Sequence, residues 1–357
     1  MLSEVGRGEH LKVPRIASVA ARPIRVTPRT TWTFARVLAE DGTEGWGEGT
    51  LEGRSAEVAA EIEAFNGRLP TLGPIPADLV SAAAYSAVEQ AKWDLEARAA
   101  GRPLVDLLGG AKRSRVALYA NINRGTADRS PAGFAARAAE AVTLGFGAVK
   151  IAPFDGVTPT QKQGIEAGYE RVAAAAQALA KRAELQVDCH WRFDVKKADE
   201  ALVECARLGV TWFECPIAET PENYPAIKRL RSRANAAGMR LAGAELFIGA
   251  EGFRPLLEQG LYDLVMPDVK YAGGLAECLR IAELAARHGC AISLHNPSGP
   301  VCHAHSVHLS AALESCERLE YQHGETPRFF EIAPGLEQPA RGSAALPAPF
   351  DIKGDFA

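Results

Sequence analysis

The chain has 357 residues, 47% of them hydrophobic and 24% charged, which is typical of a soluble globular protein with room for a large domain and a smaller one. The net charge of −4, and the lack of any apolar run near the ~20 residues that cross a bilayer, give no reason to expect nucleic acid or a membrane as a partner. The N-terminus lacks the apolar core of a secretory signal and the seven scattered cysteines form no Cys-x-x-Cys pair, so we expect a reduced, cytoplasmic protein.

The first third of the chain predicts an α+β domain, which we place at residues 1–115. Strand-like segments come first and helix-like segments follow, with glycine and proline marking the end of the region. The expected strands are 16–21, 31–39 and one within 41–50, and the expected helices are 55–65 and 78–99.

The loop expected between the first two strands contains Arg22, Arg25 and Arg29. One interpretation is a solvated surface loop. The other is a loop that reaches over a neighbouring site, where Arg25 and Arg29 would bind a substrate carboxylate.

From residue 116 to about residue 325, eight short apolar segments alternate with helix-like segments. This pattern predicts an α/β fold, a (β/α)₈ barrel of the TIM type that the N-terminal domain caps. The proline- and glycine-rich tail, residues 326–357, is expected to pack back on the cap. The expected strands are 116–122, 147–153, 183–188, 211–214, 240–244, 263–266, 290–294 and 318–321, and the expected helices are 131–144, 158–182, 196–208, 221–237, 250–259, 273–288 and 301–313.

Five of these strands end in an ionisable residue, namely Asp188, Glu214, Glu245, Asp268 and His295. In a (β/α)₈ barrel the carboxyl ends of the strands converge on one mouth, where the chemistry takes place. Three carboxylates there predict a site for a hard divalent cation, and a neighbouring acid–base pair predicts proton transfer beside it.

Several segments together resemble the enolase superfamily over nearly the whole chain: GTEGWGEGT, KWDLEARAAGRPLVDLLGG, VDCHW, WFECP, AGAELF, MPDVKYAGGL and SLHNPSGP. The spacing from Asp268 to Gly273 and Gly274, with His295 one strand later, resembles the mandelate racemase subgroup. The Asp-Xaa-His of the third strand and the HNPSGP loop resemble sugar-acid dehydratases of the galactonate dehydratase type. The resemblance implies Mg²⁺-dependent removal of the proton α to a carboxylate.

This resemblance implies roles for individual residues. Asp188, Glu214 and Glu245 would hold Mg²⁺, and His295 would be the general base, oriented by Asp268. His190 would protonate the departing hydroxyl, or else only support the metal site. Since successive strand residues alternate faces, Asp188 and His190 are expected to point the same way. Cys215 stands where many family members carry a second acid after the fourth-strand glutamate.

Three further residues are assigned to the site, namely Lys150, Asn296 and Glu320, and the role of Lys270 is left open. Lys150 either binds substrate or forms a salt bridge to a metal-ligand carboxylate. The second lysine of the racemases is replaced by Ala152, which argues against a two-base racemase. Lys270 is expected to be a loop lysine rather than the sixth-strand base of the muconate-lactonising subgroup. Asn296 and Glu320 are expected to contact the substrate, although a surface acid is the other interpretation of Glu320.

The leading hypothesis is a dehydratase that converts an aldonate or aldarate into a 2-keto-3-deoxy acid. A second hypothesis is an isomerase of the same superfamily, either a sugar-lactone cycloisomerase or an epimerase that uses His295 and Lys150. A non-catalytic barrel is the third, and the intact set of site residues speaks against it. The expected partners are a small-molecule carboxylate and, by analogy with the family, further copies of the chain.

Overall fold

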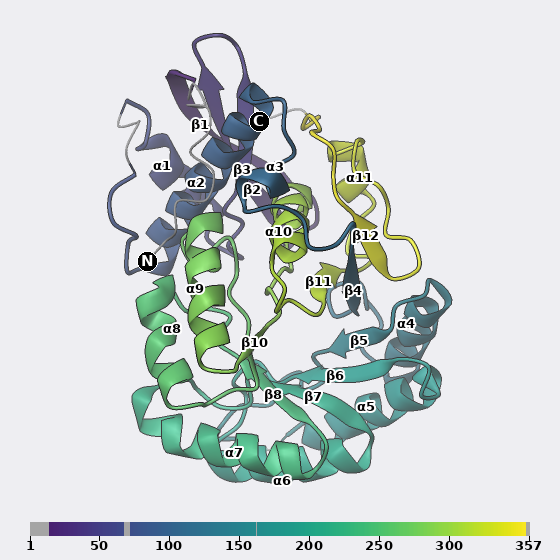
Figure 1. Cartoon of the computed structure of the whole chain (residues 1–357). Helices are drawn as coiled ribbons and strands as arrows, with labels where there is room; N and C mark the ends of the chain where they lie inside the picture. The colour runs from purple at the N-terminus through teal and green to yellow at the C-terminus, as the bar shows by residue number, and fades with distance from the viewer. Residues whose placement is uncertain (1–13, 68–71, 162, 355–357) are drawn as a thin grey trace.

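The computed structural model of the chain describes residues 14–67, 72–161 and 163–354 (Figure 1). An antiparallel sheet with its helices forms a cap over a parallel sheet that curls into a barrel (Figure 1). This confirms the predicted fold class. No helix in these three ranges is long and apolar enough to cross a membrane.

The cap sheet has the order β1-β2-β3 and packs against the long helix α2. Alternating glycines in β3 and just after it allow this contact, because a side chain on Gly45, Gly47 or Gly49 would overlap carbonyl oxygens of α2. The first strand is longer than expected, so Arg22 lies within it and Arg25 pairs with Thr31 at its end. The elements of the cap are β1 (Ile16–Arg25), β2 (Thr31–Ala39), β3 (Glu44–Glu48), α1 (Ser55–Glu63), α2 (Leu79–Ala99) and α3 (Leu104–Leu107).

The barrel strands form one parallel sheet in the order β10-β9-β8-β7-β6-β5-β4-β11. A parallel bridge between Ile292 of β10 and Cys316, three residues before β11, brings the two ends of this path together. The strands are β4 (Arg115–Asn121), β5 (Ala148–Ile151), β6 (Glu184–Asp188), β7 (Val210–Glu214), β8 (Arg240–Gly243), β9 (Leu264–Val265), β10 (Ala291–Ile292) and β11 (Leu319–Gln322).

The barrel helices lie outside the sheet, close to their expected positions with one exception (Figure 1). The helix expected at 158–182 is α5, and it is shorter at both ends. Gly164 before it and Ala180 after it have positive φ angles of 91° and 48°, which a continuing helix does not allow. The helical elements are α4 (Pro131–Thr143), α5 (Ile165–Leu179), α6 (Val195–Arg207), the 3₁₀ turn η1 (Pro221–Asn223), α7 (Tyr224–Ala236), α8 (Gly249–Glu258), α9 (Leu275–Arg287) and α10 (Pro300–Ala312).

The C-terminal segment, with α11 (Arg328–Ile332) and β12 (Ser343–Ala345), contacts both parts of the molecule. Strand β12 pairs antiparallel with β4 of the barrel. Arg98 of α2 then donates a hydrogen bond of 2.5 Å to the carbonyl of Phe350 and forms an ion pair with Asp351. The predicted return of the tail to the cap is therefore confirmed.

Two buried carboxylates of the cap hold the first turns of two barrel helices. Glu48 of β3 accepts hydrogen bonds from the backbone N–H groups of Gly299 (2.7 Å) and Cys302 (3.0 Å), at the start of α10. Glu89 of α2 accepts from Leu275 (2.8 Å) and Ala276 (3.0 Å), at the start of α9. The first N–H groups of a helix have no partner within the helix, so these contacts fix the cap to the barrel.

Glu89 gives the cap–barrel contact a pH dependence. Burial raises the pKa of its carboxyl from 4.5 to about 7, so between these values the folded protein keeps a proton that the unfolded chain has released. Protonated Glu89 therefore contributes to the free energy of unfolding. That contribution is fully present below pH 4.5 and is lost as the pH rises through about 7. The change amounts to roughly 3 kcal/mol. We expect Glu89→Gln to lack this part of the pH dependence when urea unfolding is followed across this range. Parallel pH profiles for the two proteins would contradict the assignment.

Candidate active site

Three carboxylates meet at the mouth of the barrel. Asp188 and Glu214 are paired neighbours at the ends of β6 and β7, and Glu245 lies two residues beyond β8. One oxygen from each of the three lies within 4.8 Å of the others, and all three side chains are buried. Oxygen ligands at this spacing are the kind that Mg²⁺ prefers.

The surroundings of this cluster fit a cation. Burial raises the pKa of Glu214 and, together with the negative charges of Asp188 and Glu214, raises that of Glu245 well above its usual value. Oε2 of Glu245 is buried and has no hydrogen-bond partner among the described residues. Three carboxylates this close repel one another as anions, and a bound Mg²⁺ would add positive charge to the cluster.

Asp268 and His295 form a hydrogen-bonded pair beside the cluster. Nδ1 of His295 lies 2.7 Å from Oδ2 of Asp268, and Nε2 of the same ring lies 3.5 Å from Oε2 of Glu245. Burial acts to raise the pKa of Asp268, but the charge of Lys270 and the contacts with His295 outweigh it and keep the carboxyl ionised. An ionised Asp268 favours the proton on Nδ1, which leaves Nε2 free to accept a proton on the side of the carboxylates.

His190 meets Asp188, although not by the predicted strand alternation. Strand β6 ends at Asp188, and His190 and Trp191 have positive φ angles of 47° and 55°. This turn brings Nε2 of His190 to 2.7 Å from Oδ2 of Asp188. The negative charge of Asp188 raises the pKa of His190, whose side chain is 37% exposed. The ring can thus carry a proton at the accessible side of the mouth.

Lys150 lies on the other side of the cluster, between two acids. Its Nζ is 2.7 Å from Oε1 of Glu214 and 2.9 Å from Oε1 of Glu320, so the salt bridge to a cluster carboxylate is observed. Glu320 also accepts hydrogen bonds from the Asn121 side chain (2.7 Å) and the Asn296 backbone (2.9 Å). The interpretation of Glu320 as a surface acid is therefore wrong.

The contacts of Glu320 also bear on how it could bind a substrate. Burial acts to raise its pKa, but the charge of Lys150 outweighs this and the pKa is about 2. An ionised Glu320 has no proton to offer a substrate carboxylate. Its contacts instead hold Lys150 and the Asn296 loop in place, and substrate binding by Glu320 and Asn296 stays a prediction.

The structure does not bring the two cap arginines to the carboxylate cluster. Arg25 donates to the carbonyls of Thr27 (3.4 Å) and Pro28 (2.9 Å) in its own loop, and Arg29 is exposed. Their role in substrate binding therefore stays a prediction that these contacts do not support.

Two residues that the sequence analysis did not single out lie at the mouth. Arg124, in the loop after β4, donates to Glu52 of the cap (3.2 Å) and forms an ion pair with Glu325 after β11. The ring of Tyr271 lies 6.3 Å from that of His295. Both follow the end of a barrel strand, and that position is the signal that could have found them.

Lys270 is in a loop, as expected, and its side chain is fully buried. Its Nζ donates to Oδ2 of Asp268 (2.8 Å) and to Oγ of Ser298 (2.6 Å). Asp268 therefore stabilises the protonated form of Lys270, so this lysine is not positioned to act as a base.

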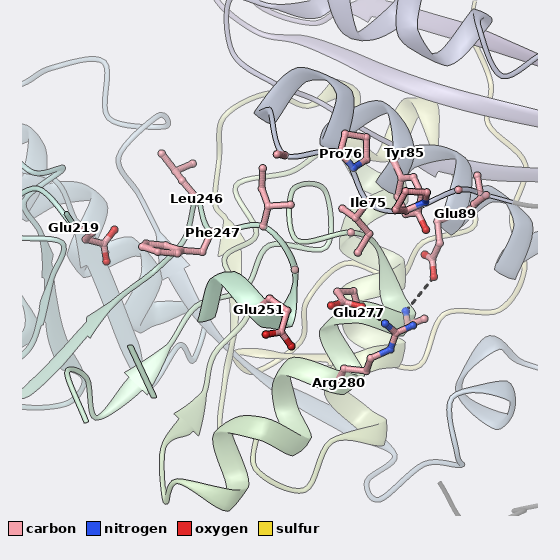
Figure 2. Close-up of a pocket in the computed structure, with 18 of the residues that line it drawn as sticks. Ile75, Pro76, Tyr85, Glu89, Glu219, Leu246, Phe247, Glu251, Glu277 and Arg280 are labelled. Atoms are coloured by element: carbon pink, nitrogen blue, oxygen red, sulfur yellow. Dashed lines mark hydrogen bonds and ion pairs between the residues drawn. The ribbon is translucent and has the colours of Figure 1, made fainter. Parts of the chain in front are cut away.

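A cavity of about 1020 Å³, lined in part by Trp191, lies between the cap segment 72–77 and helices α8 and α9. Figure 2 shows Ile75 and Pro76 of the cap on one side of it and Leu246 and Phe247 of the barrel on the other. The carboxylate cluster does not line it. Its own buried or half-buried acids are already engaged: Glu89 at the start of α9, Glu219 with Trp191 and Tyr262, and Glu277 with Ala250 and Arg280.

Comparison with known families decides the classification. Residues 133–349 match the family "Enolase C-terminal domain-like", and residues 74–109 match "Mandelate racemase / muconate lactonizing enzyme, N-terminal domain". The chain belongs to the enolase superfamily.

Two superfamily relatives of known structure align over most of the chain. A mandelate racemase/muconate lactonizing enzyme-like protein from Rubrobacter xylanophilus is 29% identical, with a TM-score of 0.83 over 95% of this chain and 94% of its own. A superfamily member from Salmonella Typhimurium, 21% identical, has a TM-score of 0.82 over 93% and 94%.

The curated superfamily relatives that match include sugar-acid dehydratases. A D-galactonate dehydratase from Verminephrobacter eiseniae is 30% identical over 305 residues, which cover 80% of this chain and 76% of the relative. A D-gluconate dehydratase from Thermoproteus tenax is 31% identical over 313 residues, or 83% of this chain; the match spans only 62% of that relative. These relatives support a dehydratase of this superfamily.

Proposed function

We propose that the protein catalyses the Mg²⁺-dependent dehydration of a sugar acid, an aldonate or aldarate, to a 2-keto-3-deoxy acid. One observation carries the proposal: the free nitrogen of the Asp268–His295 pair faces a buried cluster of three carboxylates, with His190 also hydrogen-bonded to that cluster. Removal of a proton and a hydroxyl from adjacent carbons requires a base, an acid and a cation site. The dehydratase relatives support the same reaction class.

Each residue has a role in the proposed reaction. Asp188, Glu214 and Glu245 would hold Mg²⁺, which when bound stabilises the negative charge that develops on the substrate carboxylate. His295 takes the proton from C2 through Nε2, while Asp268 holds the ring from Nδ1. His190 gives a proton to the C3 hydroxyl, which leaves as water. The enol that results loses the proton of its C2 hydroxyl, gains a proton at C3 and so becomes the 2-keto-3-deoxy acid.

The position of Lys150 disfavours the epimerase alternative. Burial acts to lower the pKa of Lys150, but the charges of Glu214 and Glu320 outweigh it and raise the pKa well above its usual value. Lys150 therefore stays protonated between its two acids, and Ala152 offers no second base nearby. Its proposed part is to supply positive charge near the substrate carboxylate.

A product screen tests the proposal. The protein is incubated with Mg²⁺ and a panel of aldonic and aldaric acids, and the product is identified as a 2-keto acid that is lighter than the substrate by one water. We expect a hit whose formation stops when EDTA is added in excess. A product of unchanged mass would establish the isomerase instead. Failure of every acid to react or to exchange its C2 proton in D₂O would overturn the proposal.

A further inference from the structure

One fully buried charge at the mouth has no part in the proposed reaction, namely the ammonium of Lys270. A buried ammonium is costly unless acceptors surround it. Here the acceptors are Oδ2 of Asp268 at 2.8 Å and Oγ of Ser298 at 2.6 Å. The side chain does not reach the carboxylate cluster, so its role must lie in what these two contacts fix.

The first contact fixes the orientation of the Asp268 carboxylate. Oδ2 accepts from Nζ of Lys270 and also contacts Nδ1 of His295 at 2.7 Å. Oδ1 accepts a hydrogen bond of 2.7 Å from the backbone N–H of Lys270 itself. Residue 270 thus holds both oxygens of Asp268, which leaves one orientation of the carboxylate and one position for the His295 ring.

The second contact ties the pair to the cap. Ser298 precedes Gly299, whose N–H donates to the buried carboxylate of Glu48 at 2.7 Å. The backbone there is packed closely, since a Cβ on Gly299 would lie 2.9 Å from Oε1 of Glu48 and 2.8 Å from the ring of Trp32. The loop between His295 and α10 is therefore held by Glu48 from the cap and by Lys270 from the barrel.

We infer that Lys270 is a positioning residue for His295, which it aligns by clamping the carboxylate of Asp268 and by linking that pair through Ser298 to Glu48 of the cap. The inference rests on the proposed function in taking His295 as the base. The hydrogen bonds of the Lys270 side chain go to Asp268 and Ser298 and to none of the three cluster carboxylates. The residues that would bind the substrate are unchanged by its removal, whereas the alignment of the base is lost.

The variant Lys270→Met tests this role, because methionine fills the same space without a donor at its end. We expect kcat and the rate of C2 proton exchange to fall about 10²-fold, the loss typical of a misplaced catalytic group, with KM within about threefold of wild type. The matched control is Lys197→Met, which removes another buried lysine, paired with Asp194 on the outer helix α6, and should leave kcat unchanged. A folded Lys270→Met protein with wild-type kcat would overturn the inference, as would a rise in KM alone.

A second variant and a second measurement keep the test decisive. Ser298→Ala preserves the ion pair with Asp268 and should cause a smaller loss of kcat than Lys270→Met, and it carries the kinetic test if Lys270→Met does not fold. A crystal structure of either variant separates this inference from the proposed function, since it needs no substrate. In Lys270→Met we expect the Asp268 carboxylate to rotate away from His295, and in Ser298→Ala to shift less. An Asp268–His295 contact that stays at hydrogen-bond length in Lys270→Met would overturn the positioning role even if the wild-type protein acts on a different substrate.

Discussion

Replacement of His295 by asparagine is expected to lower kcat for dehydration by about 10²- to 10⁴-fold, the range that a positioned general base contributes. An asparagine amide can still donate to Asp268, so the buried carboxylate keeps a partner. What is lost is Nε2, the atom that lies 3.5 Å from Glu245 and faces the proposed substrate site. The loss should therefore fall on kcat and on C2 proton exchange together, as steady-state kinetics and NMR in D₂O would measure.

Binding of Mg²⁺ should survive this change, because His295 is not one of the three residues of the carboxylate cluster. Titration calorimetry on the His295→Asn protein should therefore give a Mg²⁺ affinity close to that of wild type. His288→Asn is the matched control, since His288 is an exposed histidine that ends helix α9. Full dehydratase activity in His295→Asn would remove the proposed base.

The barrel and the convergence of its strand ends could be predicted because both follow from local periodicity. Each short apolar segment ends in its polar residue at the same point of the βα repeat, so Asp188, Glu214 and Glu245 meet wherever the strands are parallel and in register. The same rule places Asp268 and His295 beside each other. None of these contacts required knowledge of side chains elsewhere in the chain.

Features that depend on the third dimension were not accessible in this way. His190 reaches Asp188 through two consecutive left-handed residues, a backbone conformation that strand alternation does not anticipate. The sequence places Lys270 in a loop and leaves a surface acid as the alternative for Glu320, yet both side chains are buried. Glu320 is paired with Lys150 from a distant strand, and Lys270 with Asp268 two residues away and with Ser298 from a later loop. The range predicted for helix α5 is too long, because the alanine-rich sequence favours a helix whereas the positive φ of Gly164 delays its start.

The carboxylate cluster should make the metal-free protein less stable than it could be. Its three acids are buried within 4.8 Å of one another, and Oε2 of Glu245 has no hydrogen-bond partner among the described residues. Sites that bind a cation commonly keep such repulsion at a cost in stability. Glu245→Gln removes one of the three charges while it keeps the size of the side chain. We therefore expect the metal-free variant to be more stable than wild type by roughly 1 to 2 kcal/mol, which raises Tm by about 1 to 3 °C for a chain of this length.

The same variant should lose what the cluster provides. Because a ligand that binds only the folded state raises Tm with its concentration, the wild-type protein should melt at a higher temperature as Mg²⁺ is added. Glu245→Gln should show little of this rise and little dehydratase activity, so stability without metal and function change in opposite directions. Glu258→Gln serves as the control, since Glu258 is an exposed acid of α8 and its loss should alter neither quantity. A Glu245→Gln protein that melts below wild type without metal, or that still gains stability from Mg²⁺, would show that the cluster is not the cation site. A variant that melts above wild type without metal and does not respond to Mg²⁺ would place the cation among Asp188, Glu214 and Glu245.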